Sequence, residues 1–180
     1  MKEISLYVHI PFCKQRCFYC DFPTFAGKEK YREEYIDALI KEIKEKCSNY
    51  IIKTIFIGGG TPSYLETKEL EKLLKVIKNL NLSKDIEYSM ECNPGTLTKE
   101  KLMVMKKSGV NRISFGLQSC NNKLLKEIGR IHTFEEFLEN YNLARDIGFE
   151  NINVDLMYGL PNLTVDLWKE TLEKVCDLRP

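Results

Sequence analysis

Two hydrophobic patterns alternate along the chain. Short, nearly continuous apolar runs have the length of buried β-strands, whereas longer segments repeat apolar residues every three or four positions, as amphipathic helices do. The five apolar runs predict strands within residues 4–10, 53–62, 86–95, 111–119 and 150–161.

Helical patterns follow each predicted strand. Thr133 with Glu136 three residues later has the capping-box pattern of a helix start, and Gly109 and Gly148 are placed to end helices. Five strand–helix units in succession favour parallel strands joined by right-handed crossovers. The helices are predicted around residues 31–43, 70–80, 98–108, 121–128, 133–147 and 168–175.

This alternation fits either a doubly wound sheet or a partial (β/α) barrel, and the polar motifs help to decide. In parallel barrels, functional residues gather at the carboxyl ends of the strands. Here each predicted strand ends in an unusual residue or motif. They are a cysteine cluster, the sequence Gly58-Gly59-Gly60-Thr61-Pro62, Glu91, Gln118 and Asp155. We therefore predict an α/β fold, a partial (β/α) barrel with about five units and the helices outside.

Residues 1–180 are predicted to form one domain. A full (β/α)8 barrel takes about 250 residues. The chain is therefore expected to be a smaller open barrel or part of a larger one, ending where a sixth strand would follow.

Charge and composition exclude several classes of protein. Lys and Arg number 27 against 26 acidic residues, so no basic field indicates a general nucleic-acid binder. No run of about 18 apolar residues predicts a transmembrane helix, and the N-terminus lacks the pattern of a secretory signal. The seven cysteines are then expected in a reducing, cytoplasmic setting, where such spacing is more typical of metal binding than of disulfides.

Three of the cysteines, Cys13, Cys17 and Cys20, have the spacing C-x3-C-x2-C. Three thiolates can hold three irons of a [4Fe-4S] cluster and leave the fourth iron open. The alternative is a zinc site whose fourth ligand is Cys92, Cys120 or a histidine. Four aromatic residues near the cysteines, Phe12, Phe18, Tyr19 and Phe22, are expected to form an apolar shell. Such a shell tunes the redox potential and limits access of water, so it slightly favours the cluster over the zinc site.

The glycine-rich turn and the other polar residues are weaker signals when each is taken alone. The small residues of the turn would let a ligand approach the backbone and meet free N–H groups, although a tight turn without any ligand has the same sequence. His9 is predicted to be a hydrogen-bonded core residue. Cys47 and Cys176 are predicted to pack within helices.

Several motifs together resemble one known family. "CKQRCFYC" is similar to the cluster motif of radical S-adenosylmethionine (SAM) proteins. The neighbouring motifs resemble those of the oxygen-independent coproporphyrinogen III oxidase family, in the same order and over essentially the whole chain. They are "YVHIPFC", "FIGGGTPSYL", "ECNPGTLT", "RISFGLQS", "IGRIH" and "NVDLMYGLP".

The resemblance implies a [4Fe-4S] cluster on Cys13, Cys17 and Cys20, with SAM bound through its amino and carboxylate groups to the fourth iron. An electron donor such as flavodoxin or ferredoxin would reduce the cluster. The implied SAM-binding residues are Gly59, Gly60 and Thr61 at the methionine end, Glu91 and Arg130 at its amino and carboxylate groups, Gln118 and Asp155 at the ribose, Leu156 and Met157 at the adenine, and Tyr7 close to the cluster-bound SAM.

One departure from the oxidase pattern points to a particular branch. Phe22 stands where the oxidases carry a further cysteine, and "CDF" resembles the HemW-type haem chaperones. The resemblance therefore implies a protein that binds haem and delivers it to haemoproteins, with oxidative decarboxylation of coproporphyrinogen III, a porphyrin-pathway substrate, as the alternative. Members of this branch continue through a sixth strand and a C-terminal domain linked to haem binding. The chain is thus expected to be the N-terminal part of such a protein.

Overall fold

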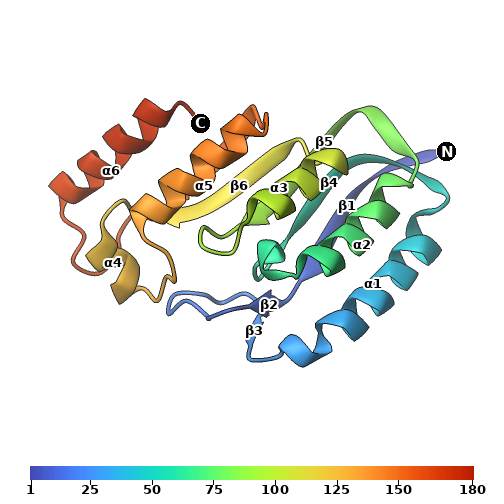
Figure 1. Cartoon of the computed structure of the whole chain (residues 1–180), viewed down its shortest axis with the longest axis horizontal. Coiled ribbons are helices and arrows are strands. Elements are labelled where there is room, and N and C mark those ends of the chain that lie inside the picture. Colours follow the sequence, from blue (N-terminus) through green and yellow to red (C-terminus); the bar gives the residue numbers. More distant parts are fainter.

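The computed structural model describes residues 1–180, and a five-stranded parallel sheet is its centre. The strands stand side by side in the order in which they occur along the chain, β1-β4-β5-β6-β7 (Figure 1). Each crossover therefore adds its strand at the same edge, as in a barrel, whereas a doubly wound sheet reverses direction. The bounds are β1 (Lys2–Ile10), β4 (Tyr50–Gly59), β5 (Leu82–Cys92), β6 (Arg112–Gln118) and β7 (Asn151–Leu156).

The helices follow one another across a single face of this sheet (Figure 1). The predicted partial barrel with outer helices is confirmed, and the doubly wound alternative is excluded. The helices are α1 (Arg32–Cys47), α2 (Thr67–Lys78), α3 (Lys99–Lys107), α4 (Asn122–Glu127), α5 (Phe134–Asp146) and α6 (Val165–Leu178), with 3-10 turns η1 (Glu29–Tyr31) and η2 (Pro62–Tyr64).

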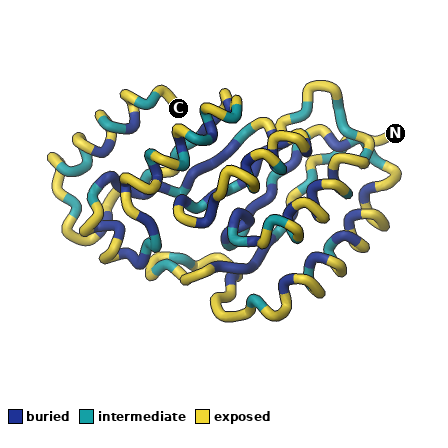
Figure 2. The backbone as a smooth tube through the Cα atoms, viewed as in Figure 1, coloured by how far each residue is buried: buried dark blue, intermediate teal, exposed yellow.

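The two faces of the sheet differ in chemistry. In β6, Ile113, Phe115 and Leu117 are fully buried under the helices, while Ser114 and Gly116 alternate with them on the other face. Only β6 is buried along most of its length, and the other strands mix buried, half-buried and exposed residues (Figure 2). Burial of the apolar face drives folding, so the opposite, concave face is free to carry polar groups.

Side-chain caps set most of the helix starts. Thr133 and Glu136 form the predicted capping box of α5, and Gly148 follows this helix with a φ of 97°. Glu66 forms a second capping box at α2 with Glu69, a pair that the sequence analysis did not identify. A capping box satisfies two otherwise unpaired N–H groups at the helix start.

A small parallel ladder between β2 (Phe12–Cys13) and β3 (Phe25–Ala26) was not predicted. It closes residues 13–24, here called the cysteine loop, at its base. The N–H of Phe25 also donates to the carbonyl of Pro11 at 2.7 Å. The loop that carries the three thiols is thereby anchored to the end of β1.

The two helical cysteines differ in environment. Cys47 is buried in the core, as predicted. Cys176 is exposed on α6, so its predicted packing role is wrong: it lies on the outer side of an amphipathic helix. Among the described helices, none combines the length and apolar character needed to cross a bilayer.

Candidate cluster and cofactor site

Strand register brings the predicted polar residues together at the carboxyl edge of the sheet. Ile10 is paired with Gly59, Glu91 with Ser114, and Gly116 with Asp155. These strand ends and the cysteine loop enclose a cavity of about 200 Å³. Ten of the predicted site residues line it: Cys13, Cys17, Cys20, Gly59, Gly60, Thr61, Glu91, Gln118, Arg130 and Asp155.

The three thiols enter the cavity from one side. Cys13 is buried at the end of β2, and the Thr61 hydroxyl donates to its sulfur at 3.6 Å. Cys17 and Cys20 are half-buried and share a turn, in which the Cys20 N–H donates to the Cys17 carbonyl at 3.1 Å. Burial raises the pKa of the Cys13 thiol, so a metal bound there must displace its proton.

These thiols suit a cluster better than one shared ion. No group of three or more His, Cys, Asp or Glu side chains is placed to hold a single metal ion. In an iron–sulfur cluster each cysteine binds a different iron, so the sulfurs need not converge on one point. The donor set and the polar cavity beside it fit a [4Fe-4S] cluster with an open iron.

The glycine turn after β4 is packed tightly against the cysteine loop. A Cβ added at Gly60 would lie 2.8 Å from the Phe12 carbonyl oxygen and 3.0 Å from the Cys13 sulfur. Such contacts are too short for any larger residue without moving the loop. Glycine at this position therefore keeps Cys13 where it is.

Of the two interpretations that the sequence left open for this turn, the one with free N–H groups is not realised. The N–H of Gly59 donates to Glu91 Oε2 at 3.0 Å, that of Gly60 to the Ile10 carbonyl, and that of Thr61 to the Phe12 carbonyl. The turn instead hydrogen-bonds to β1, β2 and β5, as in the alternative of a tight turn.

Two carboxylates line the cavity from the ends of β5 and β7, which flank β6. Asp155 accepts hydrogen bonds from Ser114 at 3.0 Å and from Asn153 at 2.7 Å, so its position is fixed. Burial raises the pKa of the Glu91 carboxyl, the Gly59 N–H opposes this shift, and the negative charge of Asp155 adds to it. A carboxylate held in such a place is typical of a functional site.

The shifted pKa predicts a pH-dependent effect of Glu91→Gln. In the unfolded chain Glu91 ionises above about pH 4.3, while in the folded chain its pKa is higher, so folding becomes less favourable as pH rises through this interval. We expect the variant to melt at a higher temperature than the unchanged chain at pH 7. The gain should shrink as pH falls toward 4.

Thermal unfolding followed by circular dichroism measures this difference. Glu45→Gln, on the exposed face of α1, is the matched control and should show no such pH-dependent gain. An increase in melting temperature of equal size at every pH, or a decrease at pH 7, would contradict the conclusion that the buried charge of Glu91 destabilises the fold.

Gln118 and Arg130 complete the wall opposite the glycine turn. Gln118 has a φ of 74°, at a register irregularity between β6 and β7. A non-glycine residue in this region is strained, and such strain concentrates at functional sites. The Arg130 guanidinium donates to Cys17 Sγ at 3.5 Å and to Asn93 Oδ1 at 3.1 Å, and its buried Nε has no partner.

Three predicted site residues lie outside the cavity lining: Tyr7, Leu156 and Met157. The Tyr7 hydroxyl is 2.8 Å from His9 Nδ1, and His9 Nε2 is 3.1 Å from the Pro23 carbonyl. Because a carbonyl only accepts, Nε2 carries the proton and Tyr7 donates to Nδ1. His9 is thus hydrogen-bonded at both nitrogens, as predicted, but it is only half-buried and does not belong to the core. It fixes Tyr7 beside the cysteine loop. The roles of all three in SAM binding stay predictions.

The predicted aromatic shell is only partly formed. Phe12 is buried, and Tyr19 and Phe22 line the cavity. Phe18 is 76% exposed, and its ring lies next to Gly129. It therefore contributes little to an apolar shell around the thiols.

Several lining residues were missed in the sequence analysis, among them Asn93, Ser114 and Gly116. A usable signal existed for all of them. Ser114 and Gly116 precede Gln118 by four and two positions on one strand, and Asn93 follows Glu91 by two. Because side chains of a strand alternate between faces, such residues share the face of a predicted site residue.

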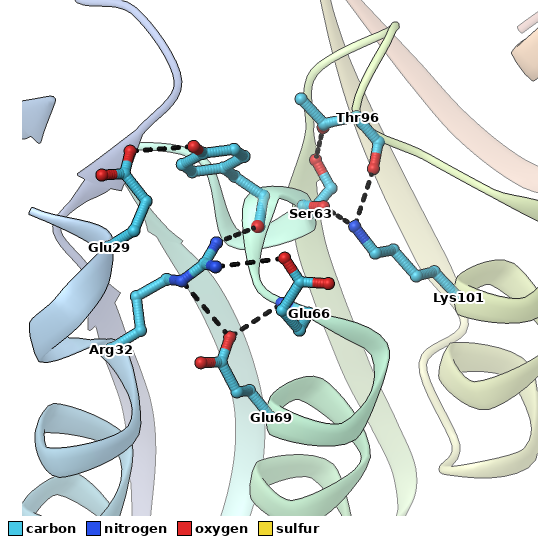
Figure 3. A network of polar contacts seen from close by, with 8 residues as sticks. Glu29, Arg32, Ser63, Glu66, Glu69, Thr96 and Lys101 are labelled. Carbon is cyan, nitrogen blue, oxygen red and sulfur yellow. Dashed lines mark hydrogen bonds and ion pairs between the residues drawn. The ribbon is translucent and has the colours of Figure 1, made fainter. Parts of the chain in front are cut away.

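A polar network that is only partly buried lies beside the site (Figure 3). Lys101 donates to the carbonyls of Ser63 and Thr96 at 2.8 and 3.0 Å, and the two hydroxyls are 2.6 Å apart. Arg32 lies between Glu66 and Glu69, bonding the former at 3.1 Å. The loops after β4 and β5 are thereby held together, which fixes two walls of the cavity.

Comparison with known proteins places this geometry in a family. The sequence pattern of the radical SAM superfamily matches residues 7–175. The chain belongs to the radical SAM superfamily. Membership of this superfamily implies a [4Fe-4S] cluster and SAM, which fits the three thiols of the cysteine loop and the polar cavity beside them.

Two kinds of curated relative share this radical SAM core. The haem chaperone HemW of Bacillus subtilis is 45% identical over 166 residues, which cover 89% of this chain and 44% of the relative. An oxygen-independent coproporphyrinogen III oxidase of Helicobacter pylori is 38% identical over 184 residues, covering 98% of this chain and 40% of the relative. The chain thus spans less than half the length of either relative.

A solved structure shows the same fold. The coproporphyrinogen III oxidase HemN of Escherichia coli, a radical SAM enzyme, superposes with a TM-score of 0.90 at 33% identity. The match covers 99% of this chain and 42% of that protein. The family resemblance that the motifs predicted is confirmed.

Proposed function

We propose that this chain is the [4Fe-4S]- and SAM-binding core of a haem chaperone. The observation that carries the proposal is the convergence of Cys13, Cys17 and Cys20 with polar strand ends on one cavity. Phe22, which lines the same cavity, stands where the resemblance places a further cysteine in the oxidases. This difference favours the chaperone over the oxidase.

We propose separate binding roles for the residues that line the cavity. The three cysteines would hold the cluster, which supplies single electrons when bound. The glycine turn would lie at the methionine end of SAM, with Glu91 at its ammonium and Arg130 at its carboxylate. Asp155 and Gln118 would accept hydrogen bonds from the ribose hydroxyls. Ser114 and Asn153 orient Asp155 for this task.

Haem or a related porphyrin, a haem-accepting protein and an electron donor such as flavodoxin or ferredoxin are the partners we propose for the whole protein. The haem chaperone name of the relatives supports the first two. The coproporphyrinogen oxidase function is the alternative, because relatives of that name share the same core.

The test is reconstitution of the chain with iron and sulfide under anaerobic conditions, followed by reduction and EPR spectroscopy with and without SAM. We expect a [4Fe-4S]⁺ signal whose shape changes on addition of SAM. A cluster signal indifferent to SAM would contradict the assigned cavity, and bound zinc without iron would contradict the cluster.

Haem titration of the whole protein, followed by the Soret absorption band, tests the chaperone role. Stoichiometric haem binding would support it. Anaerobic conversion of coproporphyrinogen III by the reconstituted whole protein would overturn it in favour of the oxidase.

A further inference from the structure

The turn between α4 and α5, residues 128–130, lies against the cysteine loop. The N–H of Phe18 donates to the Ile128 carbonyl at 3.1 Å. The side-chain amide of Gln15 donates to the Gly129 carbonyl at 3.1 Å. Two loops more than a hundred residues apart in sequence are therefore joined by direct hydrogen bonds.

Gly129 is required for this contact. Its φ of 76° is favourable only for glycine, and a Cβ there would lie 3.3 Å from two ring carbons of Phe18. The ring lies next to the glycine, so a side chain there would also have to displace it. The turn thus fixes the middle of the cysteine loop, next to Cys17.

Arg130 extends the contact to the sulfur itself. Its Nη1 donates to Cys17 Sγ at 3.5 Å, while its Nη2 donates to Asn93 Oδ1 and to the Gly116 carbonyl. The Asn93 N–H in turn donates to the Ser63 hydroxyl at 3.0 Å, within the network of Figure 3. The guanidinium is therefore held by β6 and the loop after β5, and its direction toward Cys17 is fixed.

We propose that Arg130 is a positioning residue for the cluster, which holds Cys17 and raises the reduction potential of the cluster by N–H donation to its sulfur. This inference rests on the proposed function, because it assumes that the cluster binds Cys17. Reduction adds one negative charge to the cluster. A nearby cation that donates a hydrogen bond to a ligand sulfur stabilises the reduced form more than the oxidised form. This role is separate from any contact of Arg130 with SAM.

The test compares Arg130→Gln and Arg130→Lys with Lys14→Gln in the reconstituted chain without SAM. Lys14 is an exposed cation of the same loop, so its loss removes one charge without removing a contact to sulfur. EPR-monitored reductive titration with dithionite and mediators measures the midpoint potential. Hydrogen bonds to charged groups are worth roughly a factor of ten in an equilibrium constant.

For R130Q we therefore expect the ratio of reduced to oxidised cluster at a fixed potential to fall about tenfold, a shift of about 59 mV to more negative potential for one electron. R130K should shift less, because it keeps the charge, and K14Q should change the ratio by less than about twofold. Equal potentials in R130Q and K14Q would overturn the inference.

Two further measurements separate this inference from the proposed function. If R130Q lowers SAM affinity but leaves the potential unchanged, Arg130 serves SAM alone and the inference is wrong. If R130Q loses iron while R130K and K14Q retain it, the positioning role is supported. If the unchanged chain assembles no cluster, the proposed function itself fails, and the inference fails with it.

Discussion

Replacement of Cys13, Cys17 or Cys20 by alanine, one at a time, is expected to abolish stable cluster assembly. All three thiols line the same cavity, and each would bind a different iron of the cluster. With only two protein ligands left, the cluster would be held too weakly to survive desalting. Iron per chain should fall from about four toward zero, with loss of the [4Fe-4S]⁺ EPR signal.

Cys176→Ala is the matched control. Cys176 is also a free cysteine, but it is exposed on α6 and does not line the cavity. We expect this variant to bind as much iron as the unchanged chain. Full iron retention in any one of the three loop variants would refute that ligand, and equal loss in Cys176→Ala would indicate nonspecific iron binding.

The architecture and much of the site could be predicted because both depend on local sequence patterns. Strand and helix periodicities follow from which side chains face the core, and the capping box at Thr133 is a contact between residues three apart. Parallel strands bring their carboxyl ends to one edge. The convergence of Glu91, Gln118 and Asp155 therefore followed from the predicted topology alone.

Features that depend on contacts between distant segments could not be predicted in this way. The β2–β3 ladder consists of two residues in each strand, too few for any periodicity. The N–H groups of the glycine turn are used by β1, β2 and Glu91, and nothing in the turn itself indicates those partners. The contact between Arg130 and Cys17 joins residues 113 positions apart. Such contacts depend on how three loops pack at the edge of the sheet.

Substitution of Asp155 by alanine is expected to weaken SAM binding about 10- to 100-fold while the cluster stays intact. The carboxylate lies at the cavity edge of β7, where it would accept hydrogen bonds from the ribose hydroxyls. Hydrogen bonds to a charged group contribute about 1.5–3 kcal/mol, and every 1.4 kcal/mol corresponds to about tenfold in affinity. Isothermal titration of the reconstituted chain with SAM measures the effect, and iron content and the EPR signal without SAM should be unchanged.

Two control variants, Asp155→Asn and Asp146→Ala, test whether the loss of SAM affinity is due to the Asp155 carboxylate. The asparagine keeps the shape of the side chain and an acceptor oxygen for Ser114. We therefore expect a smaller loss of SAM affinity than in Asp155→Ala, and this loss measures the contribution of the negative charge. Asp146 is an exposed aspartate at the end of α5 that does not line the cavity, and its replacement should leave SAM affinity unchanged. Unchanged affinity in Asp155→Ala, with the cluster present, would show that the ribose is held elsewhere and that Asp155 serves only to order Ser114 and Asn153.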